Sequence, residues 1–127
     1  TTGRKRRMGH LDLPTLNRAN MVKCTNEMAV TKFDWLCRYG ETILICTDFE
    51  RKGKYWETAA NAEYKLKQST PNYVELPGWS EDIQDVREFK DLPSAAQRYI
   101  KFVEDKLEVP ITMIGVGQRR DQVIVRN

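Results

Sequence analysis

One amphipathic helix followed directly by a strand constrains the fold of this sequence most. Beyond Pro93, residues that favour a buried face recur at helical spacing: Ala96, Tyr99, Ile100, Val103 and Leu107. The spacing predicts a helix that begins at Pro93, packs one face on the core and ends at Pro110. A strand over 111–114 follows at once. Together with the other strands below, this unit predicts an α/β fold.

Residues that favour strands cluster in several other short runs. The run 28–33 predicts a strand that ends at Asp34, and the nearly unbroken apolar run 42–49 predicts a strand covered on both faces. A turn over 51–54 predicts a hairpin that returns along 55–58. Further strands are expected at 73–76, stopped by Pro77 and Gly78, and at 123–125. Trp79 is interpreted as a packing anchor beneath that stop.

The segment 11–25 predicts a second helix. Asp12 is a suitable N-cap, and Pro14 is tolerated in a first helical turn. Its apolar residues form no single stripe, so we expect burial on more than one side. Residues 59–71 are polar and predict a loop with at most one short helix.

Length and composition bound the class of protein. A chain of 127 residues with 40% hydrophobic and 31% charged residues is expected to form about one domain. The net charge of +3 does not by itself indicate nucleic acid, and no apolar run suits a membrane span, so neither partner is expected. Cys24, Cys37 and Cys46 lack metal-binding spacing and read as reduced thiols of a cytoplasmic protein. With His10 as the one histidine, no metal site is predicted.

The N-terminal segment 1–7 carries four basic residues behind Gly3. It is either a solvated basic arm that could touch nucleic acid or an anion-binding loop, in which glycine admits a close backbone and arginine holds carboxylate or phosphate. The sequence opens on Thr1 instead of methionine, which is typical of a piece cut from a longer protein or of a partial sequence, and whether the natural polypeptide begins at Thr1 stays open.

Lys32 and Asp34 form a Lys-x-Asp pair at the expected end of a strand. The aspartate carboxylate can accept the N1–H and the exocyclic amino group of guanine together. On an extended segment, the lysine two residues earlier points the same way, so its stem can lie against the base. An exposed ion pair is the simpler interpretation of any isolated Lys-x-Asp.

A Gly-x-Gly pattern, Gly115-Val116-Gly117, follows the strand 111–114. A simple turn or a loop that hugs a ligand would each explain it. The phosphate-loop pattern GxxxxGK[ST] is absent from the sequence.

Five stretches in this order resemble the C-terminal part of the adenylosuccinate synthetase family. They are TTGRKRRMGHLD (1–12), TKFD (31–34), ELPGWS (75–80), LPSAAQRYIK (92–101) and VPITMIGVG (109–117). The resemblance implies that residues 1–127 are the C-terminal segment of a P-loop-like nucleotide-binding fold with a mixed central sheet. The family usually has serine at the position of Gly115 and proline at that of Gln118, so the choice between GTP and ATP stays open.

The family is a GTP-dependent ligase of purine biosynthesis that joins inosine monophosphate (IMP) and L-aspartate to adenylosuccinate. The resemblance therefore implies GTP as co-substrate, Mg²⁺ bound mainly by the N-terminal part, and a homodimer as the full-length enzyme. It also implies that the phosphate loop and the catalytic residues lie outside this chain, which alone should be inactive. Some viral relatives act on deoxyguanylate, so a related purine nucleotide is an alternative to IMP.

The resemblance assigns two sets of binding residues. Those expected to bind aspartate or IMP are Thr1, Thr2, Gly3 and Arg4. Those expected to bind GTP are Arg6, Lys32, Phe33, Asp34, Gly115, Val116 and Gly117. A free-standing module that binds nucleotide or nucleic acid through its basic arm, and a non-catalytic descendant of the family, are the alternative interpretations.

Overall fold

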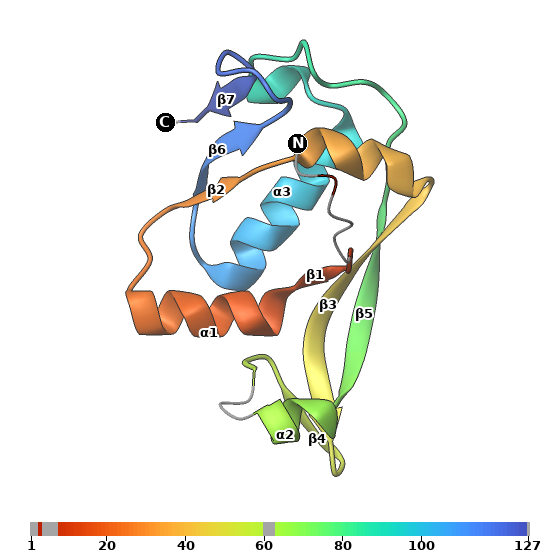
Figure 1. Ribbon diagram of the computed structural model, residues 1–127, viewed down its shortest axis with the longest axis vertical. Helices are drawn as coiled ribbons and strands as arrows, with labels where there is room; N and C mark the ends of the chain where they lie inside the picture. The colour runs from red at the N-terminus through yellow and green to blue at the C-terminus, as the bar shows by residue number, and fades with distance from the viewer. Residues whose placement is uncertain (1–2, 4–7, 60–62, 127) are drawn as a thin grey trace.

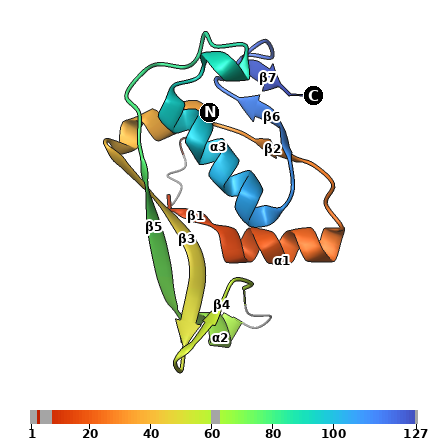
Figure 2. The same ribbon diagram turned by 180° about the vertical axis from the view of Figure 1, so that it is seen from behind.

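The structure is a computed structural model that describes Gly3, residues 8–59 and residues 63–126. Two sheets form, and helix α3 (Ser94–Leu107) lies between them in both opposite views (Figures 1 and 2). Each sheet contains a parallel and an antiparallel pair of strands. The prediction of an α/β fold with mixed strand directions is confirmed.

Strand β3 (Thr42–Arg51) is the centre of the first sheet. It pairs in parallel with β1 (Leu11–Asp12) and antiparallel with β4 (Lys54–Trp56) and β5 (Thr70–Pro77). The β3–β4 hairpin has the predicted turn, in which Lys52 and Gly53 both have positive φ, 54° and 71°. Positive φ at both loop positions is typical of the type I′ turn, whose twist matches that of the paired strands. Strand β5 is longer than the run 73–76 that predicts it.

The second sheet has the order β2-β6-β7. Strand β2 (Met28–Val30) runs parallel to β6 (Ile111–Gly115), and Val30 lies opposite Ile114. Strand β7 (Val123–Val125) returns antiparallel to β6. The C-terminal ends of β2 and β6 therefore meet at one edge, although 84 positions separate the paired residues 30 and 114.

Helix α3 supplies much of the core. All five positions of the predicted stripe are buried. An ion pair ties the end of β7 to this helix, because Arg126 donates to Glu104 at 2.7 Å. The same Glu104 oxygen accepts the backbone N–H of Ile111 at 2.7 Å, and the Arg126 guanidinium lies 4.1 Å from the ring centroid of Phe89 in the short helix η2 (Phe89–Asp91). These contacts fix where β6 begins.

Helix α1 (Leu13–Lys23) has the predicted N-cap, since the Asp12 carboxylate accepts the N–H of Thr15 at 3.0 Å. The expectation of burial on more than one side is wrong. Only Leu13 and Pro14 are buried in this helix, whereas Met21 and Val22 are 67% and 73% exposed. One short helix, α2 (Glu63–Lys67), lies within the segment 59–71, in agreement with the expectation of a loop with at most one short helix.

The strand expected over 28–33 is shorter than predicted. It ends at Val30, and the 3-10 helix η1 (Phe33–Tyr39) begins three residues later. Lys32 has φ 58° and ψ 33°, a left-handed conformation that ends extended structure. Lys32 and Asp34 therefore do not lie on one side of an extended segment, which corrects that expectation.

Ile100 provides a test of the core. Its side chain is fully buried on α3, so Ile100→Ala is expected to lower the free energy of unfolding by about 2–5 kcal/mol through lost burial and the cavity left behind. Lys101→Ala, the next and exposed position, should change it by less than about 0.5 kcal/mol. Urea denaturation of both variants measures the difference, and equal losses would contradict this packing.

Tyr99 gives the stability a pH dependence. Burial, with a smaller effect of the Tyr39 phenol, raises the pKa of Tyr99 from 10.0 to about 12. Between these values the unfolded chain loses its phenolic proton before the folded chain does, so stability falls as pH rises, by at most about 1.4 kcal/mol per pH unit from this group. Tyr99→Phe should remove that part of the slope in urea midpoints measured from pH 9 to 11. An unchanged slope would contradict the burial of the phenol.

Candidate functional site

The two segments singled out by the sequence meet at the common edge of β2 and β6. Gly115 ends β6, and a Cβ built on it would lie 3.5 Å from the Thr31 Cα and 3.8 Å from the Lys32 N. The structure thus places the Gly-Val-Gly loop against the backbone that leads to Asp34. Crevices at the C-terminal ends of parallel strands are where α/β sheets commonly bind ligands.

Phe33 anchors the Lys-x-Asp pair from below. Its side chain is fully buried, with ring centroids 5.0 Å from Trp79 and 5.7 Å from Tyr99. The ring therefore packs in the core, whereas the side chains of Lys32 and Asp34 on either side of it reach the surface. Trp79 is 4% exposed, which confirms its role as a packing anchor.

Hydrogen bonds at the start of η1 hold the backbone on both sides of Phe33. The N–H of Trp35 donates to the Lys32 carbonyl at 3.1 Å, and the Cys37 thiol donates to the Asp34 carbonyl at 3.0 Å. Lys32 is exposed and Asp34 half-buried. Neither side chain has a hydrogen bond or an ion pair within the described residues, so the alternative of a Lys–Asp ion pair is not what forms here.

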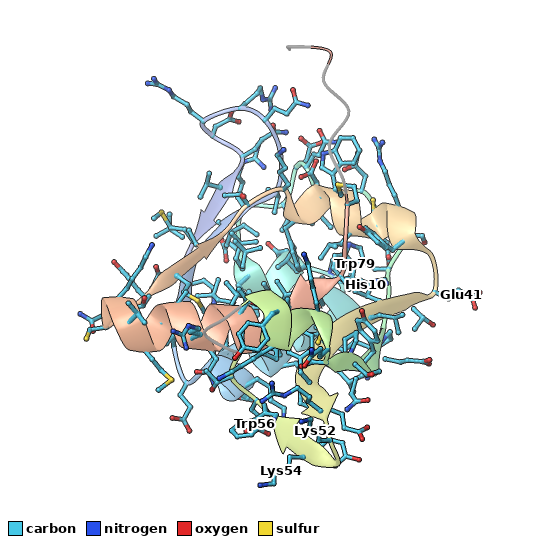
Figure 3. All side chains as sticks on the ribbon, turned by 60° about the horizontal axis from the view of Figure 1, so that its bottom comes forward. His10, Glu41, Lys52, Lys54, Trp56 and Trp79 are labelled. Carbon is cyan, nitrogen blue, oxygen red and sulfur yellow. The ribbon has the colours of Figure 1, made fainter. Side chains whose placement is uncertain are left out.

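A glycine contact fixes the far end of η1. The N–H of Gly78 donates to the carbonyl of Glu41 at 2.7 Å, and any side chain at Gly78 would collide with the carbonyl of Gly40. The end of β5 at Pro77 and Gly78 is thus hydrogen-bonded to the turn at Gly40 and Glu41, which follows η1. Figure 3 labels Glu41 and Trp79, and shows Lys52, Lys54 and Trp56 of the hairpin at a separate end of the molecule.

The Gly-Val-Gly loop is closed by its own hydrogen bonds. Val116 is fully buried and donates its N–H to the Gln122 carbonyl at 2.9 Å, while the Gln122 N–H donates to the Arg119 carbonyl at 3.1 Å. A side chain at Gly117 would collide with the Gln122 carboxamide. Packing within the loop therefore accounts for the second glycine of the pattern.

A large apolar groove opens beside Lys32. Its volume is about 600 Å³, and its walls include Leu11, Val30 and Tyr99. A second groove of about 430 Å³ shares these three residues and continues along α1 and β2. Residues 8–12 also line the larger groove, so the basic segment 1–7 directly precedes it in the chain.

Of the residues expected to bind aspartate or IMP, only Gly3 is described. It is exposed with φ 65°, a conformation that favours glycine. Thr1, Thr2, Arg4 and Arg6 lie outside the described residues. No helix of the described chain is long and apolar enough to span a membrane.

Sequence reasoning missed two contributors to this site. Tyr99 was expected only as a core residue, yet its ring also forms part of both groove walls. Gln122 was not singled out, because a polar residue before a short strand carries no periodic signal. Its burial, at 6% exposed, became visible only in the folded chain.

Comparisons with known proteins agree on one family. The family model described as adenylosuccinate synthetase matches residues 1–124. Adenylosuccinate synthetase from Halothermothrix orenii is 43% identical over 126 residues, which cover 99% of this chain and 29% of that protein. The Kluyveromyces lactis adenylosuccinate synthetase is 40% identical over 124 residues, 98% of this chain and 28% of its own.

A solved structure has the same fold. The fully ligated adenylosuccinate synthetase from Plasmodium falciparum superposes with a TM-score of 0.86 and 34% sequence identity, over 92% of this chain and 28% of its own. The chain thus spans less than a third of the length of these relatives. With a family model that matches nearly every residue, this chain belongs to the adenylosuccinate synthetase family.

Proposed function

We propose that this chain is the guanine-recognition part of a GTP-dependent ligase that joins IMP and L-aspartate to form adenylosuccinate. The observation that carries the proposal is the parallel β2–β6 pairing, which brings the Lys-x-Asp pair and the Gly-Val-Gly loop to one edge. Membership of the adenylosuccinate synthetase family supports it, because the relatives named above are adenylosuccinate synthetases, which are ligases. Residues 1–127 are proposed to be the C-terminal segment of that enzyme.

In this proposal Asp34 reads guanine. Its carboxylate has no partner among the described residues, so both oxygens can accept from the base: one from N1–H and one from the exocyclic amino group. The exposed Lys32 stem lies along the base. Phe33 and Val116 are fully buried, so they contribute through their backbone and by anchoring the two segments.

The remaining proposed contacts come from the loop and the arm. Gly115 and Gly117 line the other edge of the base with main chain. Arg6 reaches toward GTP, while Thr1, Thr2, Gly3 and Arg4 bind aspartate and IMP. The support is positional, since residues 8–12, which follow the arm, line the groove beside Lys32.

The groove supports the view that further protein packs against this chain. Within the described residues β1 pairs only with β3, and β2 pairs only with β6, so each leaves one edge open. Apolar side chains of Leu11, Leu16 and Val30 lie between these edges. Open edges beside apolar surface are where additional strands pair and bury area. We propose that the part of the ligase outside this chain packs on these open edges of β1 and β2 and on the apolar groove between them.

Magnesium is proposed to act with that other part. Among the side chains of residues 8–59 and 64–126, no group of three or more His, Cys, Asp or Glu is placed to hold a metal ion. In the complete ligase the bound ion would neutralise phosphate charge. The residues described here contribute recognition of the base.

Joining the chain to the missing part tests the ligase assignment. We expect no GTP cleavage by the 127-residue chain alone, and cleavage that requires both IMP and aspartate once it replaces the matching segment of the Halothermothrix orenii enzyme. Phosphate release measures both. The Halothermothrix orenii enzyme with its own C-terminal segment, made with the same junction residues, is the control for the effect of the junction. A folded chimaera that lacks aspartate-dependent cleavage would contradict the assignment.

Asp34 is the residue to change in that chimaera, which we call the joined enzyme. Asp34→Ala removes two charge-assisted hydrogen bonds and should raise KM for GTP about 10- to 100-fold, while KM for IMP and for aspartate changes little. Asp105→Ala is the matched control, because Asp105 is exposed on α3 and distant in sequence from the pair. Steady-state kinetics with each substrate varied in turn separates these effects.

Asp34→Asn provides a gain of function that misfolding cannot imitate. An amide offers one acceptor and one donor, which suits the N1–H and carbonyl oxygen of xanthine but opposes the amino group of guanine. The variant should prefer xanthosine triphosphate to GTP. Unchanged preference for GTP would contradict guanine recognition by this residue.

A further inference from the structure

Gln122 occupies an unusual position next to the Gly-Val-Gly loop. Among the charged and amide side chains of the described residues, it is the one that is buried, with 6% exposed. Burying an amide is unfavourable unless its donor and acceptor both find partners. A buried amide with both partners therefore holds in place the backbone groups to which it bonds.

The Gln122 carboxamide uses both of its ends. Its Oε1 accepts the N–H of Arg119 at 3.0 Å, inside the loop, and its Nε2 donates to the carbonyl of Gln84 at 3.2 Å. Its main chain adds the bonds to Val116 and Arg119 already described. The side chain thus fastens the loop after β6 to the segment around residue 84, which comes from a different part of the chain.

The same carboxamide packs directly against Gly117. The space that a Cβ at Gly117 would need is filled by the Gln122 side chain. At the other end of the loop, Gly115 rests against Thr31 and Lys32. The path of residues 115–117 is therefore set on one side by the Lys-x-Asp segment and on the other by Gln122.

We propose that Gln122 is a positioning residue for nucleotide recognition, which holds the Gly-Val-Gly loop at the distance from Asp34 that a guanine base requires. This inference rests on the function proposed above, in which the loop lines one edge of the base. Gln122 does not touch the nucleotide; it acts through the backbone of residues 116–119. Its loss should weaken GTP binding and leave the other substrates unaffected.

The primary test is Gln122→Met in the joined enzyme, because methionine has a similar length but cannot make the two amide hydrogen bonds. We expect KM for GTP to rise about tenfold, with KM for IMP and aspartate within about twofold. Gln97→Met is the matched control: Gln97 also donates its amide to two carbonyls, those of Lys90 and Leu92 at 3.1 and 2.9 Å. A comparable rise in KM for GTP with Gln97→Met would mean a general loss of stability and would overturn the proposal.

A double-mutant cycle tests the contact with Gly117. Gly117→Ala forces the Gln122 carboxamide aside and should itself raise KM for GTP. In a Gln122→Ala background the space is free, so adding Gly117→Ala should have little further effect. Equal effects of Gly117→Ala in both backgrounds would overturn the role given to Gln122.

Amide hydrogen exchange provides a readout that needs no activity. In Gln122→Met the Arg119 N–H loses its side-chain acceptor and should exchange faster, whereas the Val116 N–H keeps its bond to the backbone carbonyl of residue 122. Unchanged Arg119 protection would overturn the inference. The two proposals fail differently: a joined enzyme without GTP dependence overturns the proposed function, whereas a GTP-dependent enzyme indifferent to Gln122→Met overturns only the positioning role.

Discussion

The parallel hydrogen bonds between β2 and β6 are the constraint on which the candidate site depends. They bring residues that are far apart in the sequence into register, with Val30 opposite Ile114, and both strands then end at the same edge. The contacts proposed for the guanine base follow from the segments that leave these two strand ends. The segment after β2 is anchored by the Phe33 ring, which packs against Trp79 and Tyr99. The segment after β6 is anchored by the buried side chain of Val116. Without this pairing the Lys-x-Asp pair and the Gly-Val-Gly loop would be unrelated surface features.

Much of the fold could be predicted because its strongest signals are local. The buried face of α3 follows from helical spacing, the β3–β4 turn from Lys52 and Gly53, and the start of α1 from Asp12 and Pro14. Each depends on residues within a few positions of one another. The family resemblance was likewise visible in short motifs, and the family model that matches residues 1–124 confirms it.

The parts that could not be predicted depend on distant partners. The left-handed turn at Lys32 directly precedes Phe33, whose ring packs against Trp79, 46 positions later in the chain. The burial of Gln122 depends on the carbonyl of Gln84, and the exposure of Met21 and Val22 could be seen only once the described elements were placed around α1. No periodicity in the neighbouring sequence records such contacts. The site's outline was therefore predictable from motifs, whereas its geometry was not.

The separation of β2 from β6 along the chain also has a kinetic consequence. The β3–β4 hairpin joins residues that are three apart, Arg51 and Lys54, and hairpins of this kind form within microseconds. Pairing residue 30 with residue 114 must first close a loop that contains most of the protein, at a correspondingly larger cost in chain entropy. The edge where β2 and β6 end is thus expected to assemble late in folding, after the β3–β4 hairpin, and during synthesis only once β6 has emerged.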